Sequence, residues 1–487
     1  MKKISIDPVT RLEGHGRIDL FLDDQGEVAN AYMVIPELRG FEKFSQGRRV
    51  EELTDITPRI CGVCPEAHHL ASTKACDGVF HVDPPPAAKK LRELFYSAFY
   101  VADHTVHFYI LGGPDFVMGP DAPVAERNIL GVIHKVGVEI GTKVIEARGK
   151  AMDIIGMLGG RKVHPTFGLP GGVSKALTEE ERKQVEQTAK ESIEFALFSL
   201  QLFRDIVLAN KGYLDLIMSP IFTMSTYYMG MVDDKNKVNF YDGKIRVVDP
   251  EGKEFAKYSP NDYLEHVAER VEPWTYLKFP YLKKVGWKGL VPGKDSGVYQ
   301  ATPLSRLNAS DGMATPKAQE AYEEMYKTFG KKPVHNLLAT HWARLIELLY
   351  AAERLLELST DPGITDPKVR TIPTEKPTEG VGVVEAPRGT LTHHYVTDEK
   401  GIVTKANLIV GTTNNYAPIS IAVKQAAQGL IKKGVEVTEG ILNRVEMAFR
   451  LYDPCFGCAT HTLPGRMPLV INVIDPAGEV VRQIRRD

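Results

Sequence analysis

Two short stretches near opposite ends of the chain decide how it must fold. The first is Arg59-Ile-Cys61-Gly-Val-Cys64-Pro-Glu-Ala-His68, and the second is Asp453-Pro-Cys455-Phe-Gly-Cys458-Ala-Thr-His461. Each contains a Cys-x2-Cys pair, a spacing at which a tight turn directs two thiolates to one point. Most of the chain separates the two pairs. A four-thiolate site therefore requires a fold that brings these two stretches together.

The composition is that of an ordinary globular protein. The 487 residues are enough for one large or two ordinary domains, with 43% hydrophobic and 25% charged residues. Lys+Arg 60 against Asp+Glu 62 leaves a formal charge of −2, which gives no indication of binding to nucleic acid or an anionic membrane. We find no signal peptide, and no apolar run approaches the roughly 20 residues of a spanning helix. We therefore expect a cytoplasmic protein without direct membrane insertion, although a partner's signal can carry an attached protein across a membrane.

The five cysteines do not form a disulfide scaffold. Cys76 stands apart from the two pairs, and we expect it to be a small buried hydrophobe. Four sulfur ligands suit zinc, an iron–sulfur cluster or nickel. Structural zinc sites usually join pairs a few tens of residues apart, and the second pair lacks the typical ferredoxin spacing. The sulfur ligands alone leave these alternatives open.

The ends of the chain are predicted to be rich in β-structure and the middle to be helical. Strand-like runs Gly16–Leu22 and Glu27–Val34 flank the turn Asp23–Gly26. The same D-x-x-G turn recurs beside β-branched residues at Asp249–Gly252, Asp398–Gly401 and Asp475–Gly478, which predicts hairpins of one type. Helical periodicity and start signals predict helices over about Ala87–Leu111, Pro123–Leu158, Thr178–Asn210, Pro316–Phe329, Val334–Leu358, Pro418–Lys433 and Glu439–Leu451.

Two segments lack sustained periodicity. Residues from about Tyr213 to Ala309 are rich in Pro, Gly, Tyr and Lys, and we expect an irregular insertion with short strands. The Pro-rich stretch Asp361–Pro377 is typical of an ordered connection. The predicted architecture is α+β, a long-helix bundle flanked by small antiparallel β-sheets.

The sequences around both cysteine pairs resemble the signatures of nickel–iron hydrogenase large subunits, R-x-C-G-x-C-x3-H and D-P-C-x2-C-x2-H. Asn414 stands where respiratory members tend to have Trp, which favours the cytoplasmic, cofactor-coupled branch. The second signature favours the methyl-viologen-reducing type that feeds heterodisulfide reductase. Other motifs that resemble those of the family extend over nearly the whole chain: Asp7–His15, Arg39–Glu42, His104–Tyr109 with Asp115, His164-Pro165 with Gly171-Gly172, Ala386–Gly389 and Gly411–Asn415.

The resemblance implies a nickel–iron centre that cleaves H2 heterolytically and reversibly. Cys61 and Cys455 would be terminal ligands of nickel, and Cys64 and Cys458 would bridge nickel to iron. The iron would carry CO and two cyanides. Pro387 and Thr412 would contact the cyanides, Thr412 by donating a hydrogen bond.

The resemblance also implies residues that carry protons and charge. A terminal thiolate would accept the first proton, and Glu13 would carry it next, although a lone Glu is more often a surface charge. Arg388 would lie over the open face of the centre. Because a buried Arg is costly unless it is paired, Asp115 and Asp453 would be its charge partners, and a purely structural ion pair is the alternative.

A second metal site is implied close to the first. Glu42 and His461 resemble ligands of a Mg or Fe cation, which a hard carboxylate and an imidazole fit. The sequence does not decide whether the remaining histidines orient the site or are ordinary core residues. They are His15, His68, His104, His107 and His164.

Family members are usually made as precursors and cut after the final His. We therefore expect a catalytic domain over residues 1–461 and removal of residues 462–487 by a maturation endopeptidase. Residues 462–487 are typical of a hairpin, which could keep the second cysteine pair away from its final position.

The chain has no further cysteine pair for an Fe–S relay and no Gly-rich dinucleotide loop. Electrons are therefore expected to leave through an Fe–S small subunit, with heterodisulfide reductase, NAD(P)-linked or deazaflavin-linked subunits beyond it. Two alternative functions are considered beside a hydrogenase. One is a metal-free structural subunit like the quinone-proximal subunit of respiratory complex I, which has lost the cysteines. The other is a structural four-cysteine zinc protein.

Overall fold

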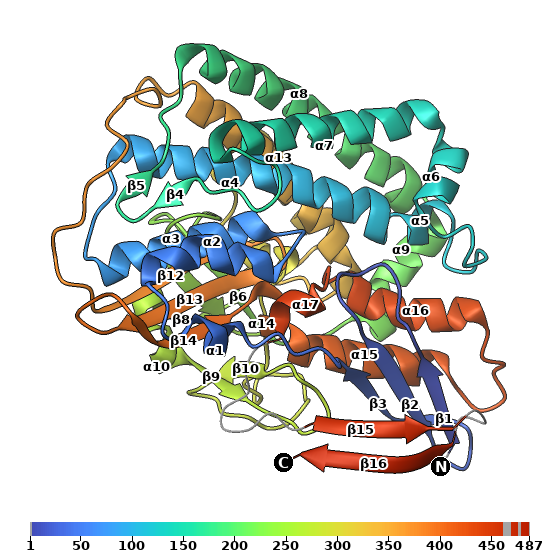
Figure 1. Cartoon of the computed structure of the whole chain (residues 1–487). Coiled ribbons are helices and arrows are strands. Elements are labelled where there is room, and N and C mark those ends of the chain that lie inside the picture. The colour runs from blue at the N-terminus through green and yellow to red at the C-terminus, as the bar shows by residue number, and fades with distance from the viewer. Residues whose placement is uncertain (1, 461–468, 476–478, 487) are drawn as a thin grey trace.

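The computed structural model describes residues 2–460, 469–475 and 479–486. Long helices occupy the upper half of Figure 1, and most of the small sheets lie below them. This is the predicted α+β architecture. Among the described residues, no helix is both long and apolar enough to cross a membrane.

The long helices form one packed body. Helix α13 (Thr340–Ser359) is buried along nearly its whole length and contacts α4 (Pro86–Val106) and α8 (Glu179–Phe203). Helix α12 (Pro316–Phe329) packs beside α13, with the bounds that the sequence predicts. Helix α8 begins at the predicted capping box: Glu181 N–H donates to the Thr178 hydroxyl, and the Glu181 carboxylate accepts from Thr178 N–H.

The predicted single helix over Pro123–Leu158 is wrong. The structure has α6 (Ile129–Val136) and α7 (Val138–Gly159), which are separated by Gly137 with φ 96°. A positive φ interrupts a right-handed helix, and glycine adopts it without strain. Helix α6 also begins later than predicted, because the Asn128 side chain accepts from the N–H groups of Leu130 and Gly131.

The other helices are shorter. Helices α15 and α16 confirm the two predicted segments before the second cysteine pair. The full set comprises α1 (Phe41–Ser45), α2 (Leu53–Ile56), α3 (Pro65–Val79), α5 (Pro114–Val117), α9 (Lys211–Met218), α10 (Tyr263–His266), α11 (Pro303–Ala309), α14 (Gly411–Asn414), α15 (Tyr416–Leu430), α16 (Glu439–Arg450) and α17 (Phe456–Ala459).

Two three-stranded antiparallel sheets come from the ends of the chain. The first has the order β1-β2-β3 and lies against α15. The second has the order β12-β13-β14 and lies against α3. Their strands are β1 (Lys2–Ile6), β2 (Arg17–Leu22), β3 (Val28–Val34), β12 (Glu379–Ala386), β13 (Gly389–Thr397) and β14 (Val403–Ile409).

The insertion at about Tyr213–Ala309 has more regular secondary structure than the sequence predicts. Its main element is a four-stranded sheet of order β11-β6-β7-β8, in which β11 pairs with β6 in parallel and the other pairs are antiparallel. The remaining sheets have two strands each. The strands concerned are β4 (Gly168–Leu169), β5 (Gly172–Val173), β6 (Tyr227–Val232), β7 (Lys244–Val248), β8 (Glu254–Tyr258), β9 (Val267–Arg270), β10 (Phe279–Leu282), β11 (Tyr299–Gln300), β15 (Leu469–Ile474) and β16 (Val480–Arg486).

The D-x-x-G turns share one hydrogen-bonding pattern, as predicted. Asp23 Oδ1 accepts from the N–H groups of Gln25 and Glu27, at 2.9 and 3.0 Å. Asp249 and Asp398 make the equivalent bonds, and the glycines of these three turns have φ between 76° and 82°. The aspartate thus closes each turn, and glycine supplies the left-handed position. The fourth turn includes residues 476–478, which lie outside the described residues.

Strand β12 lies directly on helix α3, with no side chain between the two backbones at two points. A Cβ atom on Gly382 would lie 1.9 Å from Ala71 O, and one on Gly380 would lie 2.2 Å from Ala75 O. Helix α3 begins immediately after Cys64, and β12 leads directly to Pro387 and Arg388. This close contact therefore sets the first cysteine pair against the turn that carries Arg388.

We expect Gly382→Ala to lower the free energy of unfolding by about 1–3 kcal/mol, because the added methyl group forces α3 and β12 apart. Denaturant unfolding of the purified protein measures the change. The matched control is Gly149→Ala in α7, where an added Cβ meets no atom within 4 Å. That variant should be as stable as the parent or up to ~1 kcal/mol more stable. Equal losses in both variants would contradict the close contact.

Candidate metal centre

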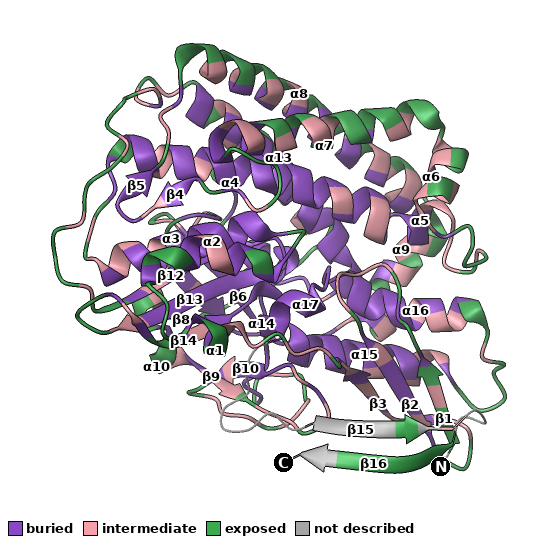
Figure 2. Ribbon diagram, viewed as in Figure 1, coloured by how far each residue is buried: buried purple, intermediate pink, exposed green. Residues whose placement is uncertain are grey.

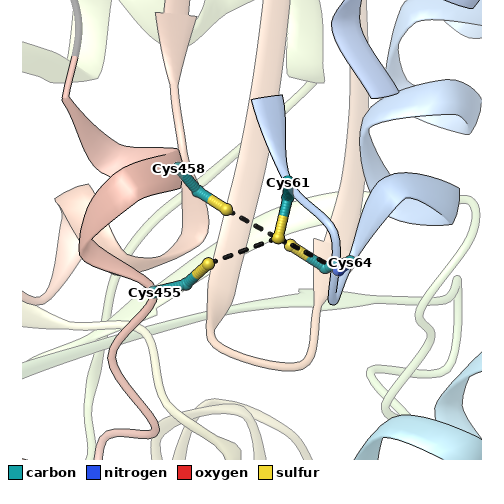
Figure 3. A group of neighbouring side chains, drawn as sticks. All are labelled: Cys61, Cys64, Cys455 and Cys458. Atoms are coloured by element: carbon teal, nitrogen blue, oxygen red, sulfur yellow. Dashed lines mark hydrogen bonds between the residues drawn. The ribbon is translucent and has the colours of Figure 1, made fainter. Parts of the chain in front are cut away.

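The two cysteine pairs meet in the interior of the protein. Their four sulfur atoms all lie within 4.8 Å of one another, and all four residues are buried. Cys61 Sγ is 3.4 Å from Cys455 Sγ, and Cys64 Sγ is 3.6 Å from Cys458 Sγ (Figure 3). Figure 2 places α17, which carries the second pair, within the buried centre of the molecule. The predicted convergence of the two distant pairs is confirmed.

The first pair is held by its own backbone and by two neighbouring side chains. The N–H groups of Val63 and Cys64 donate to Cys61 Sγ, at 3.2 and 3.1 Å. His164 Nε2 lies 2.9 Å from Cys61 O, and Arg39 donates to Ile60 O. The turn is thus fixed on both sides before α3 begins.

The second pair is held by the amino-terminal segment. Glu13 N–H donates to Pro454 O at 3.3 Å, and Phe456 N–H donates to Glu13 O at 3.0 Å. A Cβ atom on Gly14, which has φ 87°, would lie 2.5 Å from Gly457 N, so the two backbones are in close contact. The N–H of Cys455 donates to the Thr412 hydroxyl at 2.9 Å.

The thiols cannot all ionise without a cation. Burial raises the pKa of Cys455 and Cys458 well above the ordinary value; the other sulfurs add to the rise at Cys455, and Cys61 and Cys64 add to it at Cys458. Burial opposes ionisation of Cys61 too, but hydrogen bonds from the other three thiols lower its pKa. One thiolate surrounded by three thiols is the arrangement that these shifts favour. A thiophilic cation would offset the repulsion between four thiolates, so the donor set fits nickel, iron or zinc.

Glu13 lies directly beside the second pair. Its Oε2 is 3.0 Å from Cys455 Sγ and accepts from Gly457 N–H at 3.0 Å. Burial raises the pKa of Glu13, and the charge on Cys61 raises it further. A carboxyl group at this distance can exchange a proton with the thiol.

Arg388 is buried and paired with two carboxylates. Its Nη1 lies 3.0 Å from Asp103 Oδ2, and its Nη2 lies 3.1 Å from Asp453 Oδ2. Burial alone lowers the pKa of a guanidinium, but Asp103 and Asp453 outweigh it and raise the pKa of Arg388. The predicted pairing with Asp453 is confirmed.

The predicted pairing of Arg388 with Asp115 is wrong. Asp115 lies on α5 and contacts Arg11 at 2.5 Å and Arg450 at 2.7 Å. Asp103 takes the predicted place: it lies on α4 and pairs with Arg388, whereas the π-helical turn His107–Gly112 separates it from Asp115, which already has two arginine partners. Sequence reasoning missed Asp103, although an acidic residue within the apolar run Phe99-Tyr-Val-Ala-Asp103 requires a partner once it is buried.

Three histidines of the predicted motifs, His68, His104 and His107, lie next to buried polar side chains. His107 Nδ1 lies 3.0 Å from Asp453 Oδ1, and His104 Nε2 lies 3.0 Å from Glu347 Oε2. His68 Nδ1 lies 3.1 Å from the ring of His393. Burial lowers the pKa of His68, His104 and His107. Among the described residues, the metal-binding group contains the four cysteines and no histidine.

Comparisons with known proteins identify the family. A family model described as nickel-dependent hydrogenase matches residues 39–128 and 124–461, and one described as HoxL-like matches residues 3–38. The chain belongs to the nickel-dependent hydrogenase family. It is therefore the large, catalytic subunit of a nickel–iron hydrogenase, and the four-cysteine group suggests a nickel–iron centre.

Individual relatives support the same assignment. The hydrogenase is 52% identical to an iron-sulfur subunit of the F420-non-reducing hydrogenase of Archaeoglobus profundus, over 100% of both chains. It is 38% identical to the beta subunit of the NAD-reducing hydrogenase HoxS of Cupriavidus necator, again over 100% of both. A crystal structure of an NAD+-reducing [NiFe]-hydrogenase matches with a TM-score of 0.88 and 36% identity, over 95% of this chain and 100% of the other. The predicted likeness to methyl-viologen-reducing hydrogenases is confirmed, because F420-non-reducing hydrogenases are of this type.

The predicted second metal site of the hydrogenase is only partly described. Glu42 is buried, and its Oε1 accepts from Leu408 N–H at 2.8 Å. Lys278 Nζ lies 3.3 Å from Glu42 and 3.2 Å from Glu269. Burial raises the pKa of Glu42 to about 7 against the opposing charge of Lys278. The oxygen atoms fit a hard cation, and the predicted ligand His461 lies outside the described residues.

Thr412 contacts the second cysteine pair, and Pro387 is next to Arg388 in the sequence. Pro387 directly precedes Arg388, and its carbonyl accepts from Arg306 at 3.2 Å. The Thr412 hydroxyl accepts from Cys455 N–H, which leaves its own hydrogen for another acceptor. Both residues fit the predicted contacts with small ligands, and those contacts stay predictions.

The four sulfurs already lie together in the chain that carries the C-terminal extension. Strands β15 and β16 form the predicted hairpin, and the four sulfurs are together while this hairpin is attached. The physical reason lies in the bonds made by residues 453–457, which tie the second pair to Glu13 and Thr412 without the hairpin.

We expect Cys455→Ser and Cys61→Ser to abolish nickel retention, because a serine hydroxyl replaces a soft thiolate donor. Metal analysis of the purified hydrogenase measures nickel per chain. Cys76→Ser is the control, because Cys76 lies outside the four-sulfur group and contacts Val50 O. Equal nickel contents in Cys455→Ser and the parent would remove the second pair from the metal site.

Proposed function

We propose that this subunit catalyses the reversible heterolytic cleavage of H2 at a nickel–iron centre. Cys61 and Cys455 are proposed as terminal ligands of nickel, and Cys64 and Cys458 as bridges to iron. One observation carries the proposal: the four buried sulfurs meet beside a carboxyl group that contacts Cys455. A structural zinc site has no need of that carboxyl group.

The residues around the thiols have separate roles in the reaction. When bound, the nickel–iron centre supplies the redox chemistry that converts H2 into two protons and two electrons. Glu13 takes a proton from Cys455, since its Oε2 lies 3.0 Å from that sulfur. The raised pKa of Glu13 brings it closer to neutral pH, where a carboxyl group can both accept and release a proton.

Arg388 holds a fixed positive charge beside the thiols. Asp103 accepts a hydrogen bond from Nη1 and Asp453 forms an ion pair with Nη2, and the charges on Cys64 and Cys455 also raise the pKa of Arg388. This supports a guanidinium that faces the open side of the centre. We further propose that Pro387 and Thr412 contact cyanides on the iron, which also carries CO, and that Glu42 and His461 bind a Mg or Fe cation.

The metal site lies directly below an exposed loop. Gly62 and Val63 are exposed, whereas the flanking Cys61 and Cys64 are buried. This short distance to the surface supports electron transfer to an Fe–S small subunit bound at the loop. The relatives include F420-non-reducing and NAD-reducing enzymes. We propose heterodisulfide reductase or an NAD(P)-linked subunit as the acceptor, because relatives that do not reduce F420, a deazaflavin, disfavour a deazaflavin-linked one. We also propose a cytoplasmic location and removal of residues 462–487 by a maturation endopeptidase.

The proposal is tested on the complex purified with its native partner subunits. We expect nickel and iron in equal amounts per chain and H2-dependent reduction of viologen dye. Zinc alone would favour the structural zinc protein. A complex that contains no metal and has no activity would favour the complex I-like structural subunit.

We expect Glu13→Gln to abolish H2 turnover while the metals stay bound, because an amide cannot accept the proton from Cys455. The loss should be about 100-fold or more. Viologen reduction gives the activity, and metal analysis with the infrared bands of CO and cyanide reports the centre. Full activity in this variant would remove Glu13 from the mechanism.

We expect Arg388→Lys to slow turnover strongly, because lysine cannot contact Asp103 and Asp453 at once with a planar fork. The rate is measured at saturating H2, and circular dichroism checks the fold. An unchanged rate would support a purely structural ion pair. The control is Arg354→Lys, since Arg354 makes comparable ion pairs with Glu93 and Glu357 away from the thiols.

A further inference from the structure

Beyond Glu13, three polar side chains extend from the metal site to the protein surface. They are Arg39, Glu37 and His15. Exposure of the side chains is 22% at Glu13, 19% at Glu37 and 78% at His15. The line therefore begins at a buried thiol and ends at an imidazole in solvent.

The inner part of this line is organised by Arg39. Its Nη2 lies 3.5 Å from Glu13 Oε1 and 3.7 Å from Glu37 Oε2, so the two carboxylates share one guanidinium nitrogen. Its Nη1 donates to Ile60 O, which fixes the guanidinium beside the first cysteine pair. Arg39 stays charged at all relevant pH values, so it positions the carboxylates and does not carry the proton itself.

Glu37 has one oxygen that lacks a hydrogen bond. Glu37 Oε2 is buried and has no hydrogen-bond partner among the described residues. A buried carboxylate oxygen of this kind is costly, and a bound water molecule commonly satisfies it. Glu37 Oε2 faces Arg39 Nη2, and the same nitrogen faces Glu13 Oε1. A water molecule there would link the two carboxylates.

The outer part of the line leads to solvent. Glu37 Oε1 is hydrogen-bonded to His15 Nδ1. The imidazole presents most of its surface to water. The two ring nitrogens of an imidazole allow a proton to enter at one and leave from the other.

We propose that Glu37 and His15 carry protons between Glu13 and solvent, with Arg39 as a positioning residue. During H2 oxidation, the Glu13 carboxyl gives its proton to the bridging water, and that water gives one to Glu37. Glu37 then protonates His15 Nδ1, and His15 Nε2 releases a proton to solvent. No electrons move in this sequence, and each group returns to its starting state when the imidazole re-forms its first tautomer.

The route gains importance when the electron-transfer partner is bound. Arg39 contacts the residue before Cys61, so Glu13 lies close to the exposed Gly62-Val63 loop. A partner at that loop would cover the part of Glu13 that is exposed in the isolated chain. Glu37 and His15 then provide a path that leads away from Cys61. This inference rests on the proposed function.

The test uses the complete hydrogenase complex and the exchange of D2 with water. This exchange requires a proton to pass between the site and solvent, but it requires no external electron acceptor. We expect Glu37→Gln and His15→Ala to lower the exchange rate about 10-fold or more, with metal content and CO and cyanide infrared bands unchanged. Added imidazole should restore exchange in His15→Ala and leave Glu37→Gln slow.

Matched controls separate this route from general effects of the substitutions. Glu399→Gln and His134→Gln change exposed residues of the same types and should keep the parent's exchange rate. If Glu13→Gln loses exchange while Glu37→Gln and His15→Ala match the parent, Glu13 exchanges directly with solvent and this inference is wrong. If the parent complex itself contains no nickel and catalyses no exchange, the proposed function fails instead.

Discussion

The pairing of the amino-terminal segment with the second cysteine turn is the contact on which the rest of the site depends. Two backbone hydrogen bonds join Glu13 to Pro454 and Phe456, and Gly14 allows the two backbones to approach closely. The same contact places the Glu13 carboxyl beside Cys455. A single local arrangement therefore closes the four-sulfur group and supplies its proton acceptor.

A second constraint is the burial of several charges close to the thiols. Arg388 lies between Asp103 and Asp453, and Arg306 is paired with Glu347 and Glu385. Removing ions from water is expensive, and close pairing offsets that cost only when the geometry is kept. The packed helices α4 and α13 and the close contact of β12 with α3 keep it. These packed elements thus hold the two arginines and their carboxylate partners in fixed positions around the site.

The fold class, the approximate bounds of several long helices and the grouping of the four cysteines could be predicted from the sequence, because each depends on recognisable patterns, whereas helix α3 was not predicted. The D-x-x-G turns are an example, since one aspartate and one glycine determine each turn. Only one of the two partners of Arg388 could be predicted, because Asp103 lies just outside the motif that contains His104 and Asp115, and its pairing with Arg388 arises from tertiary packing. Similarly, the break at Gly137 and the contact of Gly382 with α3 depend on tertiary packing.

Within the described residues, the strands of the extension form a sheet of their own. Among the described residues, β15 and β16 pair with each other and with no other strand, so removing them leaves every other sheet intact. Thr460, the last described residue before the gap, is fully buried and follows Cys458 closely. Along the chain, α17 is the described element between the second cysteine pair and the extension. Control of metal insertion by the extension would have to act by displacing that short helix from Glu13 and Thr412, against the hydrogen bonds that hold it there.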